Sequence, residues 1–148
     1  MLSSAMTALT FSLHPQLATD TTLVGDLPLS RVLLMNDANY PWLILVPRLP
    51  AITEIVDLEA NAQIQLTGET AKAAEALKAR TACDKLNVAA LGNMVPQLHV
   101  HVIARRRSDA AWPKPVWGVV PAKPYDDAAR ARLADDLRRA LQITAPRD

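Results

Sequence analysis

The chain has 148 residues, half of them apolar, which is enough for one domain with a hydrophobic core and too few to expect two. Sixteen basic and fifteen acidic residues leave a formal net charge of +1, so no field of one sign favours nucleic acid or an acidic membrane surface as a partner. The single cysteine, Cys83, excludes an internal disulfide, and the N-terminal stretch lacks the basic start of a signal peptide. We therefore expect a cytoplasmic protein.

Two segments in the first third of the chain have the composition of β-strands. Residues 21–36 (TTLVGDLPLSRVLLMN) predict two short strands around a turn at Gly25 and Asp26, because glycine and aspartate favour turns. Residues 40–47 (YPWLILVP) predict a third strand that ends at a proline. The chain thus begins with a run of strands.

A long helix and two further strands follow. Apolar residues recur at near-helical spacing over residues 57–80, where Asp57 is a candidate N-cap and Gly68 weakens the middle of the helix. Residues 85–91 and 98–105 predict two more strands, separated by a loop. This order predicts an α+β fold with a five-stranded, mainly antiparallel sheet.

The C-terminal part of the chain differs in composition. Residues 108–125 (SDAAWPKPVWGVVPAKPY) contain several prolines and two tryptophans, which predicts an extended arm rather than a helix or a central strand. Residues 126–143 predict a final helix, with leucine at every fourth position and acidic residues at its start. We expect a single domain, in which residues 1–108 form the main part and residues 109–148 form the arm and a helix packed on it.

Polar side chains occupy alternate positions at the start of the last predicted strand. Successive side chains of a strand point to opposite faces, so Gln97, His99 and His101 share one face, with neighbours roughly 7 Å apart. The other face takes three apolar residues, Leu98, Val100 and Val102. A strand of this kind is covered on one side and borders a cleft on the other, where chemistry can take place.

Three interpretations of the two histidines remain open at this point. A metal site needs a further ligand, and neither His14 nor Cys83 nor an acidic residue lies close by in the sequence. Histidines that are merely hydrogen-bonded in a polar cleft are the second interpretation. The third is nucleophilic catalysis on phosphorus, because a neutral imidazole attacks through one ring nitrogen while an acceptor holds the other.

The stretch QLHVHVI, residues 97–103, resembles the histidine triad (HIT) motif, in which three histidines alternate with apolar residues. Gln97 stands where the first histidine belongs. Residues 33–58 resemble the strand, turn, strand and helix start of that family, so the resemblance covers residues 33–107. HIT proteins bind nucleotides and hydrolyse or transfer a nucleoside monophosphate through a covalent nucleotidyl-histidine, and the resemblance implies a HIT-like fold and a nucleotide ligand here.

The site residues follow from the resemblance position by position. His99 matches the nucleophile, and His101 matches the third histidine, which would position the phosphate or handle the leaving-group proton. Asn36 matches a residue that binds the ribose hydroxyls, and Asn93 lies near a polar residue that contacts phosphate, with a plain turn role as the alternative for each. Gln97 completes the candidate catalytic row, where it can form hydrogen bonds but cannot carry a proton.

Other positions bear on turnover and assembly. Met94 lies where many HIT hydrolases have a hydroxyl residue that assists the leaving group, so turnover is expected to be slower or substrate choice altered. A uridylyl-transferring branch of the family also has a glutamine in its triad, on the other side of the nucleophile. Three roles are open for Trp112 and Trp117 of the arm: closing over a base, packing across a subunit boundary, or packing on their own domain. HIT domains of this kind pair as homodimers, which we expect here as well.

The resemblance therefore implies a nucleotide hydrolase or nucleotidyl transferase that acts on the α-phosphate of a nucleotide derivative through a phosphohistidine intermediate. The substrate would be of the dinucleoside polyphosphate or nucleoside phosphoramidate class. A HIT protein that binds nucleotides without catalysis is the alternative. We expect no metal, no other cofactor, and no nucleic acid or membrane as a partner.

Overall fold

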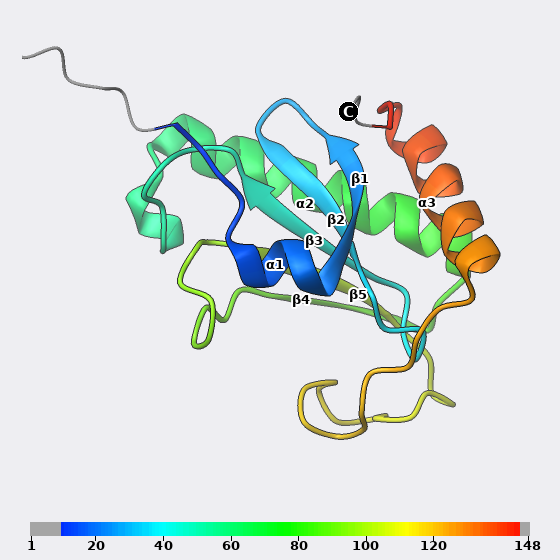
Figure 1. Cartoon of the computed structure of the whole chain (residues 1–148). Helices are drawn as coiled ribbons and strands as arrows, with labels where there is room; N and C mark the ends of the chain where they lie inside the picture. The colour runs from blue at the N-terminus through cyan, green and yellow to red at the C-terminus, as the bar shows by residue number, and fades with distance from the viewer. Residues whose placement is uncertain (1–9, 146–148) are drawn as a thin grey trace, which may run out of the picture.

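A computed structural model describes residues 10–145, which form one antiparallel sheet with helices on it (Figure 1). The sheet has five strands in the order β1-β2-β3-β5-β4. The strands are β1 (Thr21–Asp26), β2 (Ser30–Met35), β3 (Trp42–Pro47), β4 (Lys85–Ala89) and β5 (Val100–Arg105). The helices are α1 (Pro15–Asp20), the 3-10 helix η1 (Ile55–Asp57), α2 (Ala60–Thr81) and α3 (Asp127–Leu141). The expected α+β fold, with a long helix and a C-terminal helix, is confirmed.

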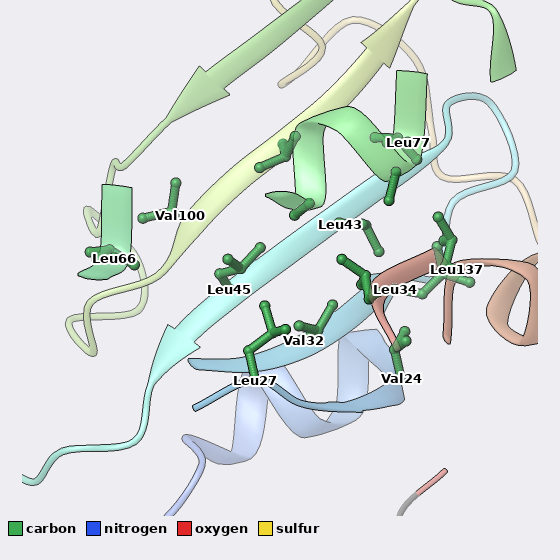
Figure 2. Packing of buried hydrophobic residues seen from close by; sticks show 14 of the residues in the cluster. Val24, Leu27, Val32, Leu34, Leu43, Leu45, Leu66, Leu77, Val100 and Leu137 are labelled. Carbon is green, nitrogen blue, oxygen red and sulfur yellow. The ribbon is translucent and has the colours of Figure 1, made fainter. Parts of the chain in front are cut away.

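One face of the sheet is covered by α2 and α3 and holds the larger hydrophobic core. Because alternate residues of a strand share a face, every second side chain of the central strands points to these helices. Figure 2 shows Leu43 and Leu45 of β3 on this face, with Leu77 of α2 and Leu137 of α3. Val100 of β5 belongs to the same cluster. The apolar side of the predicted histidine strand is therefore the side that faces the core.

The opposite face of the sheet holds a second, smaller core. Trp42 and Ile44 alternate with the leucines of β3 and point to this face. Leu17 of α1 and Val116 of the arm cover the face from outside. His101 of β5 pairs directly with Ile44 of β3 in the antiparallel ladder, and directly opposed residues share a face. The second face is therefore the one that carries the histidines.

The turn between β1 and β2 differs from the expected one. Gly25 and Asp26 lie within β1, and the chain turns only after Asp26. A Cβ atom at position 25 would lie 2.7 Å from the carbonyl oxygen of Thr144, so a long-range approach of the backbone, and not the turn, requires this glycine. The turn itself is held by Glu69 of α2, whose carboxylate oxygens accept hydrogen bonds from two backbone N–H groups, both at 2.8 Å.

The long helix begins later than expected. Its N-cap is Glu59, and the helix continues without interruption past Gly68. Asp57 serves the preceding η1 turn instead, because its carboxylate accepts hydrogen bonds from the N–H groups of Glu54 at 2.9 Å and Thr53 at 3.1 Å. These hydrogen bonds lower the pKa of Asp57 from its ordinary value. The predicted N-cap of the helix is therefore wrong by two residues.

The strands next to the histidines are shorter than predicted. The strand expected over residues 85–91 is β4, which ends at Ala89, and the strand expected over residues 98–105 is β5, which begins at Val100. Gln97 therefore lies before β5. The short helix α1 was not expected. The final helix lies within its expected range, and the Asp126 side chain accepts a hydrogen bond from the N–H of its first turn at 3.0 Å.

The arm, residues 108–125, contains neither helix nor strand, as expected. It is tied to the loop between β2 and β3 by three hydrogen bonds, one of which the N–H of Lys123 donates to the carboxylate of Asp37 at 3.2 Å. The N–H of Ala38 donates to the carbonyl oxygen of Lys123 at 2.7 Å, and the side-chain amide of Asn39 donates to the carbonyl oxygen of Pro121 at 3.0 Å. The arm is thereby held beside the end of β2, where Asn36 lies.

Candidate functional site

Two histidines meet on the second face of the sheet. His99 lies just before β5 and His101 lies in it, and both are buried, with exposed fractions of 7% and 4%. Their ring centroids are 4.9 Å apart, and the rings are nearly perpendicular. The alternation that the sequence predicts places Val100, between them, in the opposite core. The two imidazoles therefore form a compact pair in a mostly dry environment.

The imidazole of His99 is oriented by its own backbone. Its Nδ1 lies 2.7 Å from the carbonyl oxygen of Gln97. A carbonyl oxygen can only accept a hydrogen bond, so Nδ1 must carry the proton. In the neutral ring, the lone pair then lies on Nε2. His99 thus presents a nucleophilic nitrogen on the side away from its backbone anchor.

The imidazole of His101 has the opposite arrangement. The indole N–H of Trp42 donates a hydrogen bond to Nδ1 of His101 at 3.0 Å. An indole N–H can only donate, so Nδ1 is unprotonated and the neutral ring carries its proton on Nε2. Burial, together with the neighbouring His99, lowers the pKa of His101 from 6.5 to about 4. At neutral pH this ring is therefore an uncharged hydrogen-bond donor.

Aromatic side chains enclose the pair. The Trp117 ring lies 5.1 Å from the His101 ring and 5.7 Å from the Trp42 ring, edge-on to both. Trp117 comes from the arm and is 38% exposed, so it forms the outer wall of the site. The other tryptophan of the arm, Trp112, lies away from the histidines and packs over the guanidinium of Arg105 at 5.7 Å. The arm thus brings one of its two tryptophans to the site.

One hollow is lined by His99, and a second hollow is lined by Trp42 and Trp117, whose rings lie next to His101. The larger, about 410 Å³, is lined by Asn36 at the end of β2 and by Trp42 and Trp117. The hydroxyl of Thr22 donates to the side-chain oxygen of Asn36 at 2.7 Å, which fixes the orientation of the amide. The smaller, about 160 Å³, is lined by His99, by Thr53 and Glu54 before η1, and by apolar residues of η1 and the loop after β4. The site thus has a tryptophan-lined hollow near His101 and a separate hollow lined by His99, with no lining residue in common.

The other candidate residues lie around this centre. Asn93 and Met94 are exposed in the loop before β5, Met94 to 92%, and neither lines the two hollows. The carboxamide of Gln97 is bonded to the backbone of the N-terminal segment, to the N–H of His14 and the carbonyl oxygen of Ser12. Of the predicted site residues, His99 lines the smaller hollow and Asn36 the larger one, whereas His101 lines neither and lies against Trp42 and Trp117. The Gln97 side chain is turned toward residues 12–14.

The role of Trp42 is not evident from the sequence. Its position in a buried strand is typical of a core residue, and nothing in the sequence indicates that its indole N–H meets a ring 59 residues away. Within residues 10–145, no three His, Cys, Asp or Glu side chains are arranged to hold a metal ion. No helix in that part of the chain is both long and apolar enough to cross a membrane.

Comparisons with known proteins agree on one family. The model of the HIT domain matches residues 16–108. A histidine triad protein from Bradyrhizobium japonicum has a similar structure with a TM-score of 0.89 and 55% identity, over 90% of this chain and 99% of that one. One from Marinobacter aquaeolei has a TM-score of 0.87 and 46% identity, over 91% and 99%. One from Sinorhizobium meliloti has a TM-score of 0.86 and 44% identity, over 88% and 97%. No curated protein matches.

Proposed function

The chain belongs to the HIT domain family, and on that premise we propose that it is a nucleotide hydrolase or nucleotidyl transferase acting on the α-phosphate of a nucleotide derivative. The observation that carries the proposal is the pair of opposite tautomers: His99 offers a lone pair where His101 offers an N–H. A nucleophile and a hydrogen-bond donor side by side are what displacement at phosphorus requires. Substrates would be dinucleoside polyphosphates or nucleoside phosphoramidates.

In the first step, Nε2 of His99 attacks the α-phosphorus. A P–N bond forms, and the bond to the leaving atom breaks with its electron pair going to that atom. Because Nδ1 keeps its proton, the ring becomes positively charged in the phosphohistidine, and the carbonyl oxygen of Gln97 stabilises this charge through the 2.7 Å hydrogen bond. Water then attacks the phosphorus, the P–N electrons return to Nε2, and the proton that the water loses balances the proton that the leaving atom takes up from solvent.

His101 contributes a hydrogen bond rather than a charge. Its pKa of about 4 keeps it uncharged at neutral pH, and its Nε2–H can donate to a phosphoryl oxygen or to the leaving atom. The Trp42 indole holds the ring in this tautomer. In this mechanism Trp42 acts through His101 and is a positioning residue.

The nucleoside would occupy the larger hollow. Asn36 has a side-chain amide whose orientation is fixed by Thr22, which suits hydrogen bonds to the ribose hydroxyls. Trp42 and Trp117 line the same hollow and offer aromatic surface for a base. A volume of about 410 Å³ is within the usual range for small-molecule sites. Asn93 remains a candidate phosphate contact only if its loop reaches the substrate.

Nucleotide binding without turnover is the second candidate. It is favoured by Gln97, which cannot carry a proton at the position of the first histidine, and by Met94, which offers no hydroxyl to a leaving group. The hollow and the Asn36 amide would serve binding equally well.

Turnover with each substrate class separates the two candidates. We expect the wild-type protein to release mononucleotide, and His99→Ala to lose on the order of a thousandfold or more of this activity. Substrate labelled at the α-phosphate should leave label on the wild-type protein and none on His99→Ala. Thermal stabilisation by AMP or GMP without product from either class would favour binding alone. Release that persists in folded His99→Ala would exclude His99 as the nucleophile.

We also propose that the chain forms a homodimer through the outer edge of β4. This strand has a sheet neighbour on one side only, and its Val88 is 54% exposed. A hollow of about 300 Å³ lies beside it, lined by Val88, Ile55 of η1 and Leu66 of α2. An open edge with exposed apolar side chains favours pairing with a second strand.

A further inference from the structure

The side chain of Gln97 forms two hydrogen bonds to one distant segment. Its Oε1 accepts from the N–H of His14, and its Nε2 donates to the carbonyl oxygen of Ser12, both at 2.9 Å. The partners lie 83 and 85 residues earlier in the chain. A carbonyl and the N–H two residues later are also what the N–H and C=O of one residue in a neighbouring parallel strand would bind. The carboxamide therefore takes the place of a neighbouring strand for the N-terminal segment.

The backbone of the same residue holds the nucleophile. The Gln97 carbonyl oxygen accepts the hydrogen bond from Nδ1 of His99. The next N–H, of Leu98, donates to the carbonyl oxygen of Ile52 at 2.9 Å. Residue 97 is therefore held both by its side chain and by the backbone next to it. A change of its side chain should shift its carbonyl group, which accepts the hydrogen bond from Nδ1 of His99 and so sets the tautomer of that ring.

The N-terminal segment leads directly to the larger hollow. His14 is the N-cap of α1, where its Nδ1 accepts from the N–H of Gln16 at 3.1 Å. Leu17 of this helix is buried in the second core, and Thr19 and Asp20 at its end line the hollow beside Asn36. One short helix thus separates the Gln97 carboxamide from the proposed nucleoside position.

On the basis of the proposed function, we propose that Gln97 is a positioning residue that clamps residues 12–14 and thereby aligns α1, the nucleoside hollow and the His99 ring. The clamp requires a donor and an acceptor side by side on one planar group, which a carboxamide provides. The two ring nitrogens of an imidazole point away from each other, so a histidine cannot make both hydrogen bonds to this segment. Restoring the family's histidine with Gln97→His should therefore lower activity.

Hydrogen exchange tests the clamp without any need for turnover. The backbone N–H of His14 should be protected in the wild-type protein and exchange at least tenfold faster in Gln97→Ala and Gln97→His. Gln65→Ala changes an exposed glutamine of α2 that forms no side-chain hydrogen bond among the described residues, and it should leave the exchange unchanged. Equal protection of the His14 N–H in wild type and Gln97→Ala would overturn the clamp.

A pH series on Gln97→Glu tests the consequence for the site. At neutral pH the carboxylate keeps the acceptor for His14 but has no proton to donate to Ser12, so kcat/KM should fall about tenfold, the equivalent of about 1.4 kcal/mol. Protonation at lower pH restores a donor, so the ratio of variant to wild-type kcat/KM should rise as the pH falls. His14 and His99 are the ionisable residues that form hydrogen bonds with residue 97, and both are present in the two proteins that the ratio compares.

The kinetic outcomes separate this inference from the proposed function. If the wild type turns over and all Gln97 variants match it in kcat/KM, the positioning role is wrong and the catalytic proposal stands. If the wild type does not turn over, the catalytic proposal fails, and the clamp is decided by exchange at His14 and by nucleotide affinity, which should weaken in Gln97→Ala. A gain of activity in Gln97→His would overturn the positioning role.

Discussion

The two outer strands of the sheet have opposite surroundings. The carbonyl oxygens of Leu23 and Val24 in β1 accept hydrogen bonds from the guanidinium of Arg138 in α3, at 3.0 and 2.7 Å. The backbone at Thr144 approaches Gly25 closely on the same strand. β4, at the other end of the sheet, exposes Val88 and borders an apolar hollow. One edge is closed by the chain itself, and the other is left open.

This difference indicates where the chain can accept a partner. Unpaired strand edges are usually blocked by charge or covered by a helix, as β1 is here. The open edge lies next to β5, which carries His101, and Ile55 lines both the hollow beside Val88 and the hollow beside His99. A second copy at β4 would therefore cover one wall of the proposed site as well as the strand.

A charge at the open edge should break the proposed dimer. Val88→Lys would place an unpaired ammonium in the interface, which costs about 4 kcal/mol and corresponds to about a thousandfold weaker association. Analytical ultracentrifugation over a concentration series measures this. Ala131→Lys places the same charge on an exposed position of α3 and should not change association. A wild-type protein that remains monomeric at high micromolar concentration would contradict the proposed interface.

Acid should destabilise the strand just inside the open edge. His101 has a folded pKa of about 4 against an ordinary value of 6.5, so the unfolded chain binds more protons between these two values. The neutral His101 ring therefore makes its full contribution to the free energy of unfolding above pH 6.5. The free energy of unfolding falls by about 3 kcal/mol as the pH drops to about 4. Urea unfolding across this range, with an NMR titration of the ring, measures the effect. A ring that titrates near 6.5 in the folded protein would refute it.

Uncovering the closed edge should have the smallest effect of the three. Arg138→Met keeps the apolar stem and removes the hydrogen bonds to the two β1 carbonyl groups, at a cost of about 2 kcal/mol of unfolding free energy. The matched control is Arg139→Met, because that arginine is exposed and, within residues 10–145, its side chain pairs with Asp136 alone. Urea unfolding of both variants gives the comparison. Equal stability of the two variants would mean that Arg138 does not protect the edge.

The sequence predicted the structure correctly where the spacing of nearby residues determines which face of an element is buried. The alternation from Gln97 to Val102 predicted which face carries the histidines, because side chains on a strand alternate whatever the rest of the chain does. The leucine spacing of the last helix predicted its range for the same reason. Both features depend only on residues that are close together in the sequence.

What the sequence did not reveal depends on contacts between distant residues. Gly25 was assigned to a turn because nothing nearby indicates that the backbone at Thr144 approaches it. The tautomer of His101 depends on Trp42, and the partners of the Gln97 carboxamide lie at the other end of the chain. Helix α1 is too short to give a periodic signal.

The arm forms part of the wall of the larger hollow, whereas the two histidines lie in β5 or directly before it. Trp117 stands on a stretch that is anchored at Val116 in the second core and at Pro121 by Asn39. Between these anchors, Gly118 has a left-handed backbone and its neighbours are exposed. Insertions or exchanges in this short span would change the width of the larger hollow while the sheet and both imidazoles stay in place, so under the proposed function the preferred base can change without any change at the two histidines.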